Sequence, residues 1–328
     1  MTRLRAGLIG MGAMGRNHFR VLGTLENVDL VGVVDPALGT AEHAGVPVHA
    51  ELEQLLAAGV DYVTVACPTF LHEQVGLQLA EAGVHALIEK PLAATSKGAR
   101  AVRDAFAERG LVGGVGHIER YNPALQSLRE RLAAGDLGEV YQVVTRRQGP
   151  FPARIADVGV VKDLATHDID LTAWVTGRDY VSVAAQTARR SGREHEDMVA
   201  VTAELSDGVI ASHLVNWLSP QKERTTVVTG ERGALIADTL TADLTFHANG
   251  AIPLEWESQR NFRGVAEGDV TRYALARREP LLVEHEKFRD AVLSGDTNQI
   301  VDLDQGVRIV EVSEAILESA ANNATVKL

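Results

Sequence analysis

Residues 7–15 read GLIGMGAMG, an apolar run that breaks into glycines just before a helical pattern. Gly10, Gly12 and Gly15 form G-x-G-x-x-G. In a βαβ unit the first glycine allows a tight turn, the second lets the backbone approach a pyrophosphate, and the third lets helix and strand pack closely. The stretch therefore predicts a dinucleotide-binding turn, with Met11, Ala13 and Met14 beside the glycines. The alternative is an ordinary turn and helix cap, since a chain with 30 glycines can produce this pattern by chance.

Asp35 supports the first interpretation because it ends the next apolar run, residues 28–35. An acidic side chain about 20 residues after the last glycine can accept hydrogen bonds from the adenosine ribose hydroxyls. The 2′-phosphate of NADP would instead need a nearby arginine. Residues 21–89 contain neither lysine nor arginine. The sequence thus favours NAD as the cofactor, unless a distant part of the chain supplies a cation.

The pattern around this turn predicts the fold class. Before residue 120, apolar runs alternate with helical patterns, which is typical of a parallel sheet covered on both faces. After residue 120, strand-like runs come closer together, with turn signals at 206–208 and 230–233, which indicates an antiparallel sheet. We therefore expect a Rossmann doubly wound domain at 1–119 and a mostly antiparallel α+β domain at 120–328. A closing helix at 305–321 could pack back on the first domain.

Composition narrows the class of protein. The 328 residues carry a net charge of −12, which argues against a nucleic-acid binder. No apolar run approaches the roughly 18 residues of a membrane span. The N-terminus imitates a signal peptide, but glycines break its apolar part and no convincing cleavage site follows. Cys67 is the single cysteine, so no intrachain disulfide can form and we expect a cytoplasmic location. We interpret Cys67 as a small buried residue.

Two further segments carry chemistry. In LIEKPL (87–92), Lys90 ends an apolar run that precedes Pro91, at the edge where open α/β sheets place ligands. A surface lysine paired with Glu89 is the alternative. In KDLATHDIDLTAWV (162–175), Asp163, His167 and Asp170 stand at i, i+4 and i+7 and would share one face of a helix. This pattern also suits a solvated acidic face or a metal site, although no third metal ligand is evident in the sequence.

These motifs, together with ACPTFLH (66–72), resemble the glucose–fructose oxidoreductase / inositol dehydrogenase family over nearly the whole chain. The resemblance implies a nucleotide-binding domain followed by an open-faced sheet domain, a homodimer or homotetramer, and oxidation or reduction of a ring hydroxyl. It implies that Lys90 is the catalytic lysine and that His167 is the general base. In the family the bond between this lysine and the following proline is often cis, so the resemblance also implies a cis Lys90–Pro91 bond. Asp163 would bind a neighbouring hydroxyl, and the two domains would present Lys90 and His167 to one hydroxyl. Pro68, Thr69, His72 and Glu89 would lie near the nicotinamide, with a simple helix start as the alternative for Thr69 and His72.

Substrate identity is the least determined feature. The stretch 146–170 and residues 279–288 resemble a subgroup that acts on nucleotide-activated amino sugars such as UDP-N-acetylglucosamine. Arginine forks match phosphate oxygens well, so Arg146, Arg147 and Arg154 could bind a diphosphate, or they could be structural. Arg120 and Asn122, in HIERYNP (117–123), are further candidates for substrate contact. A free sugar or inositol is the second interpretation, and a non-enzymatic NAD-binding regulator is the third. Retention of Lys90, Asp163 and His167 together argues against the regulator.

Overall fold

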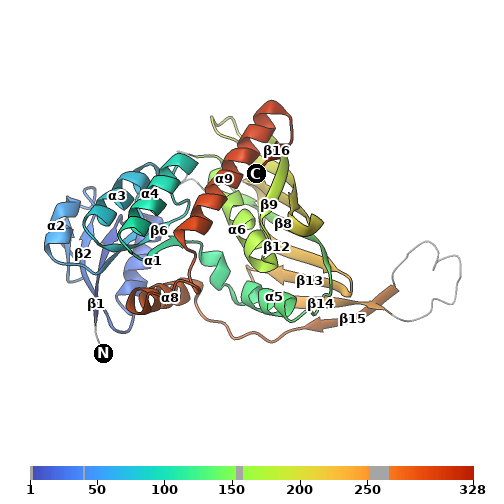
Figure 1. Cartoon of the computed structure of the whole chain (residues 1–328), viewed down its shortest axis with the longest axis horizontal. Helices are drawn as coiled ribbons and strands as arrows, with labels where there is room; N and C mark the ends of the chain where they lie inside the picture. The colour runs from blue at the N-terminus through green and yellow to red at the C-terminus, as the bar shows by residue number, and fades with distance from the viewer. Residues whose placement is uncertain (1–2, 40, 153–157, 251–265) are drawn as a thin grey trace, which may run out of the picture. The chain divides into compact units, whose positions relative to one another are not determined.

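The computed structural model describes residues 3–39, 41–152, 158–250 and 266–328. The chain folds into two compact units (Figure 1), and each is built from two separate segments. Unit 1 contains residues 1–118 and 279–314, and unit 2 contains residues 119–278 and 315–328. Our division after residue 119 placed residues 120–328 in the second domain, with a closing helix that could pack back on the first. The structure instead returns residues 279–314 to unit 1.

Unit 1 is a sheet of seven described strands in the order β3-β4-β2-β1-β5-β6-β7. All neighbouring strands run parallel except the short β3–β4 pair. The doubly wound parallel sheet that the sequence predicts is therefore confirmed, although the short strands β3 and β4 were not expected. The strands are β1 (Leu4–Ile9), β2 (Val28–Val34), β3 (Glu42–His43), β4 (Val46–His49), β5 (Tyr62–Val65), β6 (His85–Glu89) and β7 (Gly113–Gly116).

Helices cover both faces of this sheet because its strands are apolar on both sides. On one face lie α2 (Leu52–Ala57), α3 (His72–Glu81), α4 (Ser96–Glu108) and the first part of α9 (Leu303–Asn322). On the other face α1 (Ala13–Leu22) packs beside α8 (Pro280–Ser294), and Phe288 of α8 enters the core around β1. Short 3-10 turns span Thr69–Leu71 and Ile118–Tyr121. The two apolar cores, one on each face of the sheet, hold its strands in place. The candidate site is built from the turns that follow the carboxyl ends of these strands.

Unit 2 is a sheet of nine described strands in the order β15-β14-β13-β12-β8-β11-β10-β9-β16. Its pairs are antiparallel apart from β8 with β11, which confirms the mostly antiparallel prediction. The strands are β8 (Val140–Pro150), β9 (Tyr180–Ala188), β10 (Met198–Leu205), β11 (Ile210–Asn216), β12 (Leu218–Gly230), β13 (Gly233–Asp238), β14 (Asp243–Gly250), β15 (Ala266–Arg272) and β16 (Val326–Lys327).

One face of this second sheet packs against α5 (Pro123–Ala133) and α6 (Thr166–Thr176). A π-helical turn, η3 (Val161–Ala165), leads into α6, and a 3-10 turn, η4 (Ser206–Gly208), joins β10 to β11. Burial alternates along β10, where Val199, Val201 and Ala203 are buried while Ala200 and Thr202 are exposed. This period of two places one set of side chains toward the helices and leaves the other set open.

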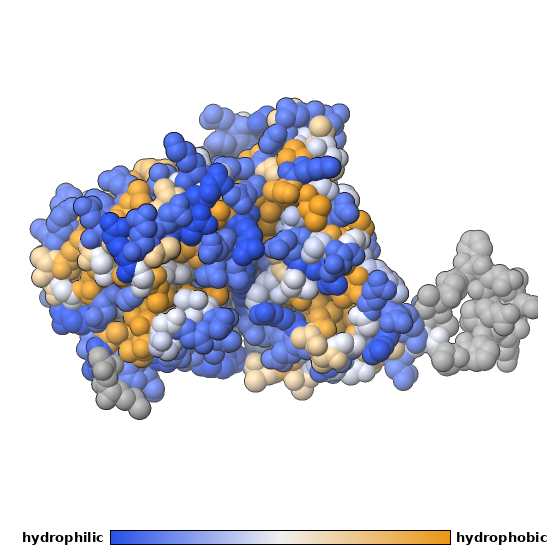
Figure 2. Space-filling view, viewed as in Figure 1, coloured by the Kyte–Doolittle hydropathy of each residue, from blue (hydrophilic) through white to orange (hydrophobic). Residues whose placement is uncertain are grey.

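Hydrophilic residues are spread over both units on the face shown in Figure 2, with apolar residues between them. Among the described residues, no helix combines the length and hydropathy needed to cross a bilayer.

Candidate active site

The glycine turn lies at the carboxyl end of β1, where the strand order of unit 1 reverses. β1 pairs with β2 on one side and with β5 on the other, which is the switch point where open α/β sheets bind ligands. Gly10 has φ +92°, and a Cβ there would lie 2.6 Å from the carbonyl oxygen of Ala66. A Cβ on Gly15 would lie 1.9 Å from the carbonyl oxygen of Gly10. Both positions therefore require glycine, as the motif predicts.

Gly12 has a different surrounding, which suits a ligand. It is the exposed N-cap of α1, and within the described chain no atom lies within 4 Å of the position that a Cβ would take. No side chain caps this helix and its first turn carries no acidic residue. Its first N–H groups are thus available to an anion, as helix N-termini commonly are. Gly12 and Ala13 are exposed beside these groups, Met14 is half-buried, and Met11 is buried. This turn fits the pyrophosphate of a dinucleotide.

Asp35 stands directly after β2 and next to the glycine turn. Its Oδ2 accepts a hydrogen bond from the Met11 N–H at 2.7 Å, and its Oδ1 accepts one from the Ala37 N–H at 2.9 Å. A carboxylate offers about four lone-pair sites. The two backbone bonds therefore orient Asp35 and leave acceptor capacity for ribose hydroxyls.

The turns after β5 and β6 are tied together by His72. Its Nδ1 lies 2.8 Å from the carbonyl oxygen of Pro91, and its Nε2 lies 3.0 Å from that of Cys67. Burial lowers the pKa of His72, although both backbone contacts oppose that change. His72 is buried, and both of its ring nitrogens contact backbone carbonyl groups. We therefore assign His72 a structural role, which is to hold these two turns together. Pro68 is exposed and Thr69 half-buried in the turn that it holds. Burial also raises the pKa of the Cys67 thiol to about 11, as suits an unreactive cysteine.

Lys90 follows β6 directly and is half-buried, and its bond to Pro91 is cis. Its backbone N–H donates to Oε2 of Glu89 at 3.1 Å. The other carboxylate oxygen of Glu89, Oε1, lies 2.9 Å from Nε2 of His18. Glu89 is only 8% exposed. Lys90 is therefore paired with Glu89, as the alternative supposes, but the lysine is half-buried and the carboxylate buried.

His18 and His285 were not among the residues that the sequence singled out. Nδ1 of His18 lies 2.8 Å from Nε2 of His285, and both rings are fully buried. One signal was available, because His18 falls three residues after Gly15 on the buried stripe of α1, which also contains Val21 and Leu22. An imidazole on an apolar stripe needs a partner, but its partner on α8 comes 267 residues later.

In unit 2, Asp163 and His167 do not lie on one continuous α-helix. Residues 161–165 form a π-helical turn, and α6 begins at Thr166. The expected α-helical i, i+4 alignment of Asp163 with His167 is therefore corrected, because i→i+5 bonding rotates the first turn relative to the helix. Such π-turns occur frequently at functional sites. Asp163 is buried and His167 half-buried.

Arg147, expected to bind a diphosphate, is instead a buried structural residue. It is only 2% exposed, and its Nε and Nη1 each lie 2.8 Å from a carboxylate oxygen, those of Asp168 and Glu119 respectively. Arg224 also contacts Glu119, at 3.1 Å. Burial would raise the pKa of Glu119, but the two guanidinium groups hold it below its ordinary value. Arg147 is thus buried against two carboxylates and is not presented at the surface of the unit.

Arg120 and Asn122 have similar structural contacts. Nε of Arg120 lies 3.0 Å from both carboxylate oxygens of Asp170, and its guanidinium lies 5.8 Å from the centroid of the Trp174 ring. Asp170 therefore serves α6 as an anchor. Asn122 caps α5 by accepting from the Ala124 N–H, and it donates to the carbonyl oxygen of Thr239. Arg154 lies outside the described residues, and Arg146 is exposed near Glu223 at 3.3 Å.

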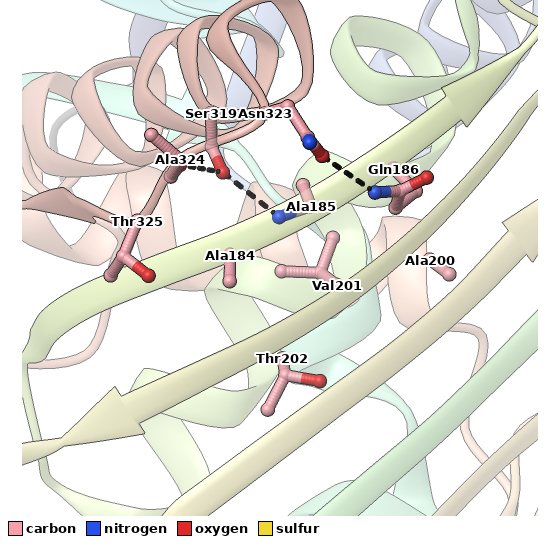
Figure 3. A pocket seen from close by; sticks show the side chains of 10 residues that line it. All are labelled: Ala184, Ala185, Gln186, Ala200, Val201, Thr202, Ser319, Asn323, Ala324 and Thr325. Carbon is pink, nitrogen blue, oxygen red and sulfur yellow. Dashed lines mark hydrogen bonds between the residues drawn. The ribbon is translucent and has the colours of Figure 1, made fainter.

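A hollow in unit 2 lies elsewhere, on the strands β9 and β10 (Figure 3). It is lined by mostly small or polar side chains from these strands, from the end of α9 at Ser319, and from residues 323–325, where Asn323 bonds to Gln186. None of the predicted site residues lines it. Over the described ranges, no group of three or more His, Cys, Asp or Glu side chains is arranged to hold a metal ion.

Comparison with known proteins agrees with this geometry. Residues 4–117 match the model of an oxidoreductase family with an NAD-binding Rossmann fold, and residues 125–236 match the GFO/IDH/MocA C-terminal domain. The chain belongs to the GFO/IDH/MocA family. It is an NAD(P)-dependent dehydrogenase acting on CH–OH groups, with an NAD-binding Rossmann domain. The interpretation as a non-enzymatic regulator is therefore set aside.

Particular relatives fall into two groups. UDP-N-acetylglucosamine 3-dehydrogenase of Acidithiobacillus ferrooxidans is 32% identical over 89% of this chain and 90% of its own. A structure of that enzyme superimposes with a TM-score of 0.84 at 29% identity, covering 98% of this chain and 99% of that one. The scyllo-inositol 2-dehydrogenase (NAD(+)) of Bacillus subtilis is 26% identical over 99% of this chain and 96% of its own. GenD2 from gentamicin A biosynthesis, solved with NAD, has a TM-score of 0.82 at 28% identity, covering 100% of this chain and 97% of that one.

Proposed function

We propose that this enzyme oxidises a ring hydroxyl of a nucleotide sugar, with the C3 hydroxyl of a UDP-linked N-acetylhexosamine as the first candidate. The observation that carries the proposal is the match, along most of both chains, to the UDP-N-acetylglucosamine 3-dehydrogenase. A free sugar or inositol is the second candidate, because inositol dehydrogenases align at 26–33% identity. Unit 1, with residues 1–118 and 279–314, would serve as the cofactor domain, and unit 2, with residues 119–278 and 315–328, as the substrate domain.

The cofactor would be held by groups already described in unit 1. The first N–H groups of α1, around Gly12 and Ala13, would bind the pyrophosphate, and Asp35 would accept from the ribose hydroxyls. Pro68 and Thr69 would border the nicotinamide. When bound, NAD supplies the acceptor for the hydride that leaves the carbinol carbon.

The proposed acid–base groups are Lys90 and His167. The ammonium of Lys90 would stabilise the oxyanion that develops as the hydroxyl loses its proton, an effect that strengthens when water is excluded. His167 would accept that proton, since an imidazole can do so near neutral pH. Asp163 would accept a hydrogen bond from a neighbouring hydroxyl and so orient the ring.

The arginines no longer support the nucleotide sugar as the sequence suggested. Arg147 is engaged by Asp168 and Glu119, and Arg120 by Asp170. Arg146 is the exposed arginine of β8. A diphosphate contact is therefore proposed for Arg154 and, second, for Arg146. The support for a nucleotide comes mainly from the resemblance to the relative that acts on one.

We also propose a cytoplasmic homodimer or homotetramer. The open face of the unit 2 sheet supports the oligomer, because Ile210 and Leu214 of β11 are 41% and 38% exposed there. Apolar side chains gathered on one face are commonly covered by a partner. Sedimentation of the purified protein measures this directly, and a monomer at micromolar concentration would contradict the proposal.

The substrate class is tested by following NADH formation with UDP-N-acetylglucosamine, N-acetylglucosamine, glucose and inositol. If the nucleotide supplies remote binding energy, its removal should lower kcat/KM and not only raise KM. We expect kcat/KM for UDP-N-acetylglucosamine to exceed that for each free compound by at least about 100-fold, the order of effect that orientation can supply. A higher kcat/KM with inositol or a free sugar would favour the second candidate.

A further inference from the structure

Three titratable side chains form a buried line in unit 1, beside the turn that carries Lys90. His285 of α8 contacts His18 of α1 at 2.8 Å, and His18 contacts Glu89 of β6 at 2.9 Å. The two rings meet edge to face, with centroids 5.1 Å apart. Both histidines are fully buried. The line therefore connects two helices to the strand end through two fully buried rings and a carboxylate that is only 8% exposed.

The hydrogen-bond geometry determines where the protons lie. A carboxylate can only accept, so His18 donates from Nε2 to Glu89. If His18 is neutral, its Nδ1 accepts from the Nε2–H of His285. Within the part of the chain that the structure describes, Nδ1 of His285 has no partner, and a proton there would be a buried donor without an acceptor. The arrangement thus favours two neutral rings and one ionised carboxylate. Burial lowers the pKa of His285 well below its ordinary value, and His18 adds to this effect.

The line keeps Glu89 ionised in a buried position. Burial by itself raises the pKa of this carboxyl, but the hydrogen bond from His18, followed by the charge of Lys90, lowers the pKa below its ordinary value. His72 of α3 also interacts electrostatically with Glu89. On the β7 side Glu89 packs against Gly116. His18 is therefore the principal group that favours the ionised form.

We propose that His18 and His285 are positioning residues for Lys90. They hold Oε1 of Glu89, so that Oε2 faces the Lys90 N–H and fixes the backbone from which the lysine side chain extends. We name His285, His18 and Glu89 the histidine–carboxylate clamp. The proposal rests on the proposed function in one respect, namely that Lys90 acts on the substrate.

The first test measures the clamp without turnover. Nitrogen NMR of the ring nitrogens in ¹⁵N-histidine-labelled full-length protein, with His18→Gln and His285→Gln for assignment, reports the tautomer of each ring. We expect Nε2 to be protonated and Nδ1 unprotonated in both histidines at neutral pH. A doubly protonated His285, or rings that exchange tautomers freely, would overturn the clamp.

The second test measures its effect on the reaction. His18→Leu should reduce kcat about 10–100-fold, the scale of a small misplacement of a reacting group, with the Kd for NAD changed less than about threefold. His18→Gln retains a donor toward Glu89 and should recover most of the loss. His213→Gln, which alters a buried histidine of unit 2, is the matched control and should keep kcat near the wild-type value. Equal kcat for wild type and His18→Leu, with the NMR pattern intact in wild type, would overturn the proposal.

The pH profile separates positioning from general destabilisation. Without His18, burial would dominate and Glu89 would take up a proton at higher pH. The kcat of His18→Leu relative to wild type should therefore fall further from about pH 8 to about pH 6. Adding His18→Leu to Glu89→Gln should cost little more, because the carboxylate is already gone. A ratio that stays constant with pH would contradict the clamp. If wild type oxidises no hydroxyl compound at all, the proposed function fails, while the NMR measurement still decides the clamp.

Discussion

At the scale of single residues, Asp35 carries the distinction between the two nicotinamide dinucleotides. Its carboxylate is fixed by the N–H groups of Met11 and Ala37. A 2′-phosphate placed against it would meet like charge, and residues 21–89 provide no lysine or arginine to offset that repulsion. We expect NAD to bind at least about tenfold more tightly than NADP, which corresponds to about 1.4 kcal/mol.

Fluorescence titration with each reduced cofactor measures this difference. Asp35→Ser should narrow the ratio of the two dissociation constants, because the repulsion is removed together with the ribose contact. Asp29→Ser, on the exposed part of β2, is the control and should leave the ratio unchanged. A dissociation constant for NADP equal to or below that for NAD would refute the role of Asp35.

Lys90 and His167 are the residues on which turnover should depend most. Lys90→Met or His167→Ala should lower kcat by about 10²–10⁴-fold, the usual contribution of a positioned acid–base group. The affinity for NAD should change little, since neither residue is proposed to hold it. Steady-state kinetics beside cofactor titration separates the two effects. More than about a tenth of wild-type turnover in either variant would contradict that residue's role.

At the scale of elements, two buried ion pairs hold α6 in place within unit 2. Asp168 bonds to Arg147 and Asp170 bonds to Arg120. Arg147→Met should therefore destabilise the protein by about 3–5 kcal/mol, because it leaves Asp168 and Glu119 as buried charges without their main partner. Urea unfolding measures the loss.

Arg146→Met is the matched control, since Arg146 is the exposed neighbour on the same strand. We expect its effect to stay within about 0.5 kcal/mol. Equal free energies of unfolding for the two variants would show that the buried ion pairs of Arg147 contribute little to the stability of unit 2.

The outcome for these elements shows what sequence patterns can and cannot predict. Strands and helices were predictable because apolar periodicity is local, and the glycine turn because its chemistry fits in nine residues. The roles of Arg147 and His18 were not predictable. Each depends on partners far along the chain, such as Asp168 for Arg147 and His285 for His18. The π-turn at 161–165 was missed because no residue pattern distinguishes it from an α-helix.

At the scale of the whole molecule, buried neutral histidines in both units predict sensitivity to acid. Burial lowers the pKa of His213 to about 4, and that of His285 well below its ordinary value. The unfolded chain binds protons at about pH 6.5 while these folded-state rings do not. Their contribution to stability is therefore complete above about pH 6.5 and is lost as the pH falls.

Each such ring should reduce the free energy of unfolding by about 2 kcal/mol between pH 7 and pH 5. Urea midpoints at the two pH values measure the slope. His213→Gln cannot titrate but can still reach the Thr145 and Tyr180 hydroxyls that bond to His213. Its free energy of unfolding should therefore fall by about 2 kcal/mol less between pH 7 and pH 5 than that of the wild type. An unchanged slope would place the acid sensitivity elsewhere in the molecule.

The discontinuous composition of unit 1 also has a consequence for biosynthesis. Phe288 and Ala291 of α8 complete the core on the α1 face of the first sheet, yet they leave the ribosome only after residues 119–278. At about 5–20 residues per second, that interval lasts roughly 10–30 s. During it the nascent Rossmann sheet exposes Leu22, Leu25 and neighbouring apolar side chains, the kind of surface that chaperones bind. Translation speed through the middle of the message should therefore affect the yield of folded enzyme more than speed near its start.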